Sequence, residues 1–264
     1  MHFLRTHWIR LFLMLDLFLL AVIAGLYASG QPVVSGVLNK ISGTVSGAVR
    51  LAQSDLTHAS AAQQEKSVHL DVPLILQKPE LPRGCEVTSL AMMLAQAGVR
   101  VDKMELAANL KKLPYRSDDR YGDPDDGFVG NMYHLNQPGF GVYHRPLADL
   151  AGQYLPFRID DLSGKSFDAV LASLDKGRSV VVWTNVTFRP LPDSAFETWR
   201  TGNGKIRVTR SEHAVLVTGY DGGHIYFNNP LGGKNERADR TAFIRAWEQM
   251  GSQAVTYRTI PFIN

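Results

Sequence analysis

Cysteine is almost absent from this sequence, because Cys85 is the only one among 264 residues. A single thiol cannot form a disulfide within the chain, so a fold held together by internal disulfides is excluded. Free cysteine is most often buried and behaves as a small apolar side chain. Three roles therefore remain for Cys85: a buried inert residue, a link to another chain, or a reactive thiol.

Runs of basic residues are also missing. Lysine and arginine total 28 against 25 acidic residues, and the formal net charge is a mild +3. The sequence has no stripe of basic and aromatic residues of the kind that binds nucleic acid, and it has no internal repeat. We therefore expect no nucleic-acid partner.

One long apolar run is present, at the N-terminus. Residues 11–28 are apolar except for Asp16, and two arginines precede them. This length approaches the roughly 20 residues of a membrane-spanning helix, and the basic flank predicts that the N-terminus stays in the cytoplasm. Residues 1–30 are predicted to be either a membrane anchor, in contact with the lipid bilayer through residues 11–28, or a signal peptide cleaved near residues 28–30. Both alternatives place the rest of the chain outside the cytoplasm, attached to the cell membrane by a single pass or secreted.

The composition changes again near residue 67. Residues 31–66 are rich in Ser, Ala, Gly, Gln and Val and have no aromatic side chain, which predicts a flexible stalk. Residues 67–264 are long enough for one domain with a hydrophobic core. Cysteines outside the cytoplasm usually pair, so an unpaired thiol in an exported domain needs an explanation.

The apolar pattern of residues 67–264 predicts helices followed by antiparallel strands, which is an α+β fold. Helices are expected from residue 85 to about 97, and over 103–111, 166–176 and 240–251. Strands are expected over 179–186, 212–220, 224–228 and 254–260, after an extended edge segment at 69–77. A long loop is expected over residues 114–146, and a protruding hairpin or flap is expected over residues 188–210.

Cys85 follows a turn that contains Pro82 and Gly84, and it opens the first of these helices. The N-terminus of a helix carries unpaired N–H groups and a partial positive charge, which stabilise a thiolate. This position favours a nucleophile, provided that the chain also supplies a base.

His213 is the best candidate base among the eight histidines. It begins a strongly apolar strand that would hold its ring rigidly, although a packed or solvent-edge histidine is the alternative. Asn229 follows the next strand of the same hairpin and can accept a hydrogen bond from the imidazole, although Asn-Asn-Pro is also an ordinary turn sequence. The order Cys, His, Asn is that of papain-like enzymes, and the three residues together favour catalysis.

Acidic residues crowd the predicted long loop. Their spacing does not match the EF-hand pattern, and no Glu closes the set. We expect a solvated loop at these positions, with no metal and no cofactor; the residues are Asp118, Asp119, Asp123, Asp125 and Asp126.

Four stretches of the sequence resemble the cysteine-peptidase family-thirty-nine-like group, exported bacterial proteins related to bacteriocin-processing leader peptidases. They are Val72-Pro73 with Gln77, Gly84 through Leu90, Gly122 through Gly130, and Trp199 through Tyr220 with Asn229-Pro230. The resemblance implies a papain-like fold, in which the helix that carries the cysteine packs on an antiparallel sheet that carries the histidine and the asparagine. It also implies that Cys85 is the nucleophile, His213 the base, Asn229 the orienting residue and Gln77 an oxyanion donor.

These residues predict an exported or membrane-anchored cysteine peptidase that acts on a peptide or protein. Two alternatives stay open at this point. The first is a non-catalytic cell-surface binding module that keeps the fold. The second is a transamidase or peptidoglycan hydrolase that uses the same three residues on cell-wall peptide.

Overall fold

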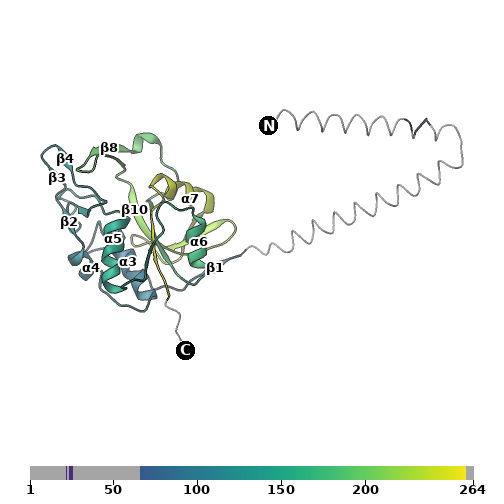
Figure 1. Cartoon of the computed structure of the whole chain (residues 1–264), viewed down its shortest axis with the longest axis horizontal. Coiled ribbons are helices and arrows are strands. Elements are labelled where there is room, and N and C mark those ends of the chain that lie inside the picture. Colours follow the sequence, from purple (N-terminus) through teal and green to yellow (C-terminus); the bar gives the residue numbers. More distant parts are fainter. Residues whose placement is uncertain (1–21, 23, 26–65, 260–264) are drawn as a thin grey trace. The chain divides into compact units, whose positions relative to one another are not determined.

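The computed structural model describes residues 22, 24–25 and 66–259 (Figure 1). The predicted targeting segment (1–30) and stalk (31–66) lie almost entirely outside these positions. No helix in the part that is described is long and apolar enough to cross a membrane.

A seven-stranded antiparallel sheet forms the centre of residues 66–259. Its main path runs through β12 (Glu236–Asp239), β11 (His224–Asn228), β10 (Glu212–Tyr220), β7 (Val180–Asn185), β13 (Ala254–Tyr257) and β6 (Ile159–Asp161). The remaining strand, β1 (Val68–His69), pairs with the far end of β10. β7 and β10 are the most apolar strands and are buried on both faces, so they lie in the interior of the sheet.

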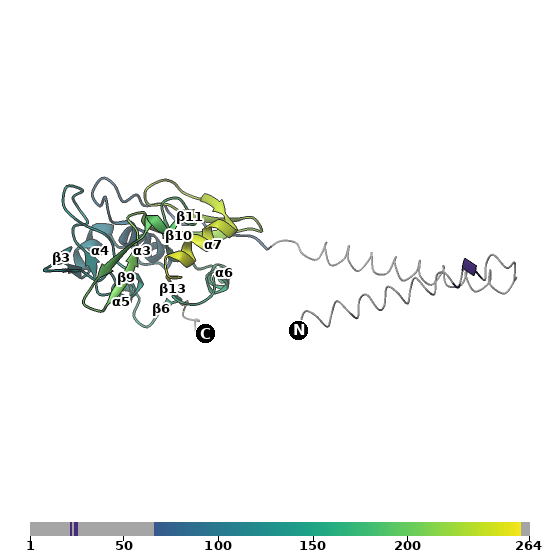
Figure 2. The same ribbon diagram turned by 90° about the horizontal axis from the view of Figure 1, so that it is seen from above.

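Helices cover both faces of this sheet. In the described part of the chain they are α3 (Cys85–Gln96), α4 (Lys103–Asn109), α5 (His144–Tyr154), α6 (Asp168–Leu174) and α7 (Arg240–Gln249). Because successive strand residues point to opposite faces, Trp183 of β7 packs with α3, α4 and α5, whereas Val182 packs with α6 and α7. Figure 1 shows the two helix groups on either side of β10, and Figure 2 shows the arrangement from above. The predicted α+β class is confirmed.

The start of α3 is set by a close contact in the turn before it. Gly84 is the N-cap residue and provides no side-chain hydrogen bond. A Cβ atom at this position would lie 2.6 Å from Cβ of Leu81, a separation that only glycine avoids. The helix therefore begins at Cys85, as predicted, and its next residues are buried against β10.

The predicted hairpin within residues 188–210 is present as β8 (Glu197–Arg200) and β9 (Lys205–Val208). It is not a free flap, because Trp199 is 1% exposed and stacks on Tyr121 with ring centroids 4.2 Å apart. Tyr121 belongs to the preceding irregular region, which contains the short strands β2 (Lys112–Leu113), β3 (Arg116–Ser117), β4 (Arg120–Tyr121) and β5 (Phe128–Val129). The hairpin is thus packed onto that region.

Three parts of the sequence prediction need correction. The long loop predicted to end at residue 146 ends earlier, because α5 begins at His144; this helix was not predicted. Pro146 falls in its first turn, where no N–H donor is needed.

The predicted solvated acidic loop is also partly wrong, since Asp123 is buried and accepts a hydrogen bond from Oγ1 of Thr201 at 2.7 Å. The strands β6 and β12 were not predicted either.

Candidate active site

A cavity of about 350 Å³ opens beside the first residue of α3. It brings together three of the four site residues predicted from the sequence, Gln77, Cys85 and His213. The rest of its wall is formed by Pro82, Arg83, Gly139, Phe140, Val186, Arg210, Glu212 and Leu231. The cavity therefore has apolar, cationic and carboxyl groups around a thiol and an imidazole.

The Cys85 thiol is in its neutral form in this site. It is 7% exposed, and Sγ donates a hydrogen bond to Oε2 of Glu86 at 3.3 Å. Burial, with the carboxyl groups of Glu86 and Glu212 nearby, raises the thiol pKa well above its ordinary value. Desolvation and like charge therefore oppose the stabilisation of a thiolate that was expected from the helix N-terminus.

His213 lies at the second position of β10 and is 2% exposed. Its Nε2 lies 2.9 Å from Oδ1 of Asn229, the residue that directly follows β11. Burial lowers the pKa of His213, and the hydrogen bond with Asn229 opposes this effect only in part. The imidazole is therefore neutral near pH 7.

Neighbouring groups fix the orientation of the Asn229 amide. Nδ2 donates to Oε2 of Glu236 at 2.9 Å, and Oδ1 also accepts from the backbone N–H of Leu231 at 3.0 Å. Because Oδ1 can only accept, Nε2 of His213 carries the hydrogen and Nδ1 is left as a proton acceptor. The amide thus selects the tautomer that a general base needs.

Gln77 lines the cavity but already uses its donor group. It is 1% exposed, and Nε2 donates to the carbonyl oxygens of Leu81 and Pro82 at 3.1 and 3.0 Å. Oε1 is buried and has no hydrogen-bond partner among the described residues. In this conformation the two hydrogen bonds donated by the Gln77 amide stabilise the turn before Cys85.

Glu86 and Glu212 also belong to the site, and reasoning from the sequence missed them. One oxygen of each carboxyl group and Sγ of Cys85 lie within 4.8 Å of one another. Burial raises the pKa of Glu86 to about 7, and burial with the neighbouring Glu86 raises that of Glu212 well above its ordinary value. The sequence did contain one indication that these glutamates lie in the site, because each is adjacent in sequence to a predicted catalytic residue. In the described part of the chain, these three side chains form the only set of three with the chemistry and spacing to hold a metal ion.

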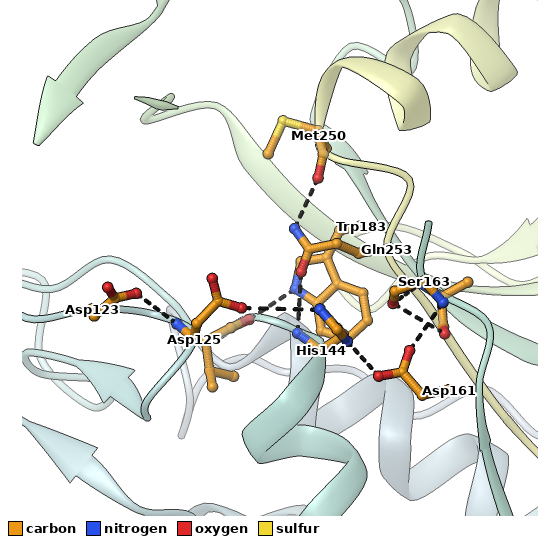
Figure 3. A network of polar contacts seen from close by, with 10 residues as sticks. Asp123, Asp125, His144, Asp161, Ser163, Trp183, Met250 and Gln253 are labelled. Carbon is orange, nitrogen blue, oxygen red and sulfur yellow. Dashed lines mark hydrogen bonds and ion pairs between the residues drawn. The ribbon is translucent and has the colours of Figure 1, made fainter. Parts of the chain in front are cut away.

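A second polar network surrounds His144, at the start of α5 (Figure 3). Nδ1 of His144 lies 2.5 Å from Oδ2 of Asp161, and Nε2 lies 3.9 Å from Oδ1 of Asp125. Oε1 of Gln253 accepts from the backbone N–H of His144 at 3.1 Å. This network joins β6, the region before β5 and the segment before β13. The hydroxyl of Ser163, shown in the same network, is hydrogen-bonded to the backbone of Ala254 and not to the imidazole.

Residues 69–255 match the model of the Peptidase_C39 like family. A relative from Bacillus subtilis (strain 168), named uncharacterized protein YvpB, is 49% identical over 210 residues, which span 76% of this chain and 82% of that protein. A crystal structure from Bacillus anthracis, named as a candidate C39-like peptidase, is 48% identical with a TM-score of 0.73 and covers 74% of this chain and 98% of the other. The matched range contains every residue of the candidate site.

Proposed function

This chain belongs to the Peptidase_C39 like family, and we propose that it is a cysteine peptidase that hydrolyses a peptide or amide bond. In this proposal Cys85 is the nucleophile, His213 the base and Asn229 the residue that orients His213. The observation that carries the proposal is the shared cavity, lined by the Cys85 thiol and by an imidazole whose tautomer Asn229 selects.

The proposed reaction starts from a neutral thiol and a neutral imidazole. Nδ1 of His213 accepts the thiol proton while Sγ of Cys85 bonds to the substrate carbonyl carbon. The imidazolium then gives the proton to the leaving amine, the C–N bond breaks, and an acyl-enzyme remains. Water, deprotonated by His213, releases the acyl group and restores the thiol. Before the first step the thiol must turn from Glu86 toward His213.

We propose that the negative charge on the tetrahedral intermediate is stabilised by N–H groups at the start of α3. The backbone N–H of Cys85 belongs to the first turn of the helix and has no acceptor within the helix. Gln77 is the proposed second donor, provided that one amide hydrogen is released from Leu81 or Pro82. Loss of such a donor typically reduces turnover by about 10²–10³-fold.

Replacement of the nucleophile tests the proposed function most directly. Cys85→Ala should abolish cleavage of a fluorogenic peptide mixture and labelling by an acyl-directed thiol probe. Glu248→Gln is a matched control, because Glu248 is exposed on α7, on the sheet face opposite α3. Cleavage that survives Cys85→Ala would refute the proposal.

A non-catalytic binding module is the second candidate, and two observations favour it. The resting thiol donates to Glu86, and the donor group of Gln77 is already used. Tight binding of a peptide by both the wild type and Cys85→Ala, with no turnover by either, would support this alternative. Profiling on peptides and on isolated cell wall separates a peptidase from a transamidase or peptidoglycan hydrolase.

We also propose that residues 11–28 place the protein at the cell membrane, with residues 67–264 outside the cytoplasm. The support is the apolar run and its basic flank. Fractionation of cells that express the full chain, with and without residues 1–30, tests this proposal. Equal distribution of both forms in the cytoplasm would contradict it.

A further inference from the structure

Glu86 and Glu212 approach the nucleophile from two different elements. Glu86 is the second residue of α3, and Glu212 is the first residue of β10, on the strand face that α3 covers. Both carboxyl groups lie close to the backbone of Gly141. A Cβ atom added to Gly141 would be 2.5 Å from Oε1 of Glu86 and 3.0 Å from Oε2 of Glu212. Gly141 therefore leaves the space that the two carboxyl groups occupy.

No cation compensates this pair in the described part of the chain. Neither Glu86 nor Glu212 forms an ion pair with Lys or Arg among residues 66–259. Arg83 and Arg210 line the same cavity, but Arg83 donates to backbone carbonyls and Arg210 to Glu197 and the hydroxyl of Tyr115. Two buried carboxylates this close cannot both be ionised without a compensating charge.

The hydrogen-bond donors divide unequally between the two carboxyl groups. Glu86 accepts the backbone N–H of Val142 at 2.8 Å and the Cys85 thiol at 3.3 Å. Oε1 of Glu212 is buried and has no partner among the described residues. Donors stabilise the ionised form of a carboxyl group, so the charge belongs on Glu86 and the proton on Glu212.

We propose that Glu86 and Glu212 share one proton and that this pair holds the Cys85 thiol protonated until substrate binds. Glu86 is then a positioning residue for the nucleophile. The inference rests on the proposed function, because it takes Cys85 as the nucleophile. Burial and the carboxyl pair act in the same direction on the pKa of the thiol. The other ionisable groups that face the cluster are His213, Tyr143, Arg83 and Arg210.

The lone cysteine makes the test specific, because iodoacetamide can alkylate a thiol only at Cys85. The alkylation rate of the full chain is measured by mass spectrometry from pH 5 to pH 11. Glu86→Gln keeps an oxygen acceptor for Val142 and removes the charge. It should lower the midpoint of the pH profile by about one pH unit and raise the rate at pH 7 about tenfold. The exposed control Glu248→Gln should leave the profile unchanged.

Glu212→Gln gives an independent reading if Glu86→Gln does not fold. It removes the second carboxyl group, which also raises the pKa of the thiol, so the midpoint should fall. The fall should be smaller than in Glu86→Gln, because Glu86, which accepts the thiol hydrogen bond, is kept. A midpoint that is unchanged in either folded variant overturns the proposal. A chelator that reproduces the effect of Glu86→Gln also overturns it, because the cluster would then hold a metal ion. Loss of peptide cleavage in Cys85→Ala is a separate measurement, so a failure of the proposed function is recognised independently.

Discussion

His213 and His144 are each hydrogen-bonded through a ring nitrogen to a side-chain oxygen, but the partners differ in charge. The partner of His213 is the neutral amide of Asn229, at 2.9 Å. His144 lies between the carboxyl groups of Asp161 and Asp125 (Figure 3). His213 is almost completely buried and faces a cavity with a thiol, whereas the His144 side chain is 17% exposed and links three segments of the fold.

This difference separates a histidine that can exchange a proton from one that holds structure. A neutral partner fixes the tautomer of His213 and leaves its pKa lowered by burial, so the ring can accept a proton at neutral pH. In the second network, the group whose pKa shifts strongly is the carboxyl group of Asp161. Burial opposes ionisation of Asp161, but hydrogen bonds from His144 and Ser163 outweigh it and lower the Asp161 pKa to about 2. Asp161 is therefore ionised at all ordinary pH values.

Replacement of each histidine gives the largest contrast. His213→Ala should reduce turnover of a fluorogenic peptide by about 10²–10⁴-fold, because the proposed general base is lost. His144→Ala should keep most of the turnover per folded molecule and lower the midpoint of urea unfolding. Equal losses of turnover in the two folded variants would remove the functional distinction between them.

Asn229→Asp should bring the surroundings of His213 closer to those of His144. A carboxylate within hydrogen-bond distance raises the pKa of an imidazole. The acid limb of the pH profile of kcat/KM should therefore move upward by about one pH unit. Asn229→Ala is the companion variant and should reduce turnover without this upward shift, since the tautomer is no longer fixed. An acid limb at the same pH in the wild type and in Asn229→Asp would show that His213 is not the titrating base.

Asp161→Asn should reduce stability in a pH-dependent manner. The pKa of Asp161 is lowered in the folded state to about 2, so its contribution is present above the unfolded value near 3.9 and is lost as the pH falls through about 2. The carboxyl group is 36% exposed, so solvent screening leaves only about 1 kcal/mol at pH 7. Urea unfolding of both proteins at pH 7 and near pH 2 checks this. A difference that is equally large at both pH values would contradict the assignment.

Trp183→Phe should have the smallest effect on turnover. The indole Nε1 donates to the carbonyl oxygen of Val142 at 2.8 Å, and the N–H of Val142 donates to Glu86. Phenylalanine keeps a buried aromatic ring and leaves this carbonyl without its donor. We expect a loss of about 2 kcal/mol in the free energy of unfolding, from the unpaired buried carbonyl and the smaller ring together, measured by urea titration. A large loss of turnover with unchanged stability would mean that this bond positions Glu86 directly.

Much of the site geometry could be predicted from local patterns. The turn before Cys85 and the apolar spacing after it predicted the start of α3, which Gly84 enforces by its close approach to Leu81. The apolar run after His213 and the following turn predicted β10 and β11 as one hairpin, with Asn229 following the second strand, within hydrogen-bond distance of His213 in the structure. These features depend on residues that are near one another in the sequence or on one hairpin.

The missed features depend on distant residues. Helix α5 follows a loop rich in Gly, Pro and Asp, and its amphipathic pattern is short: Leu147, Leu150 and Ala151 are the buried positions after Pro146. The position of Glu86 and Glu212 beside Cys85 was missed because glutamate at the start of a helix or strand is ordinarily exposed. The two carboxyl groups come together only because α3 packs on β10 and because Gly141 leaves space for both of them.

The sequence by itself determined the family, the α+β class and the order of Cys85, His213 and Asn229 along the chain. These properties follow from residue types and from spacing over one helix or one hairpin. The tertiary structure alone decided the burial of Glu86 and Glu212 beside Cys85 and the packing of the β8–β9 hairpin. Protonation depends on burial and on charges from other elements, and a helix N-terminus that favours a thiolate in isolation is opposed when Glu86 and Glu212 are buried beside the sulfur.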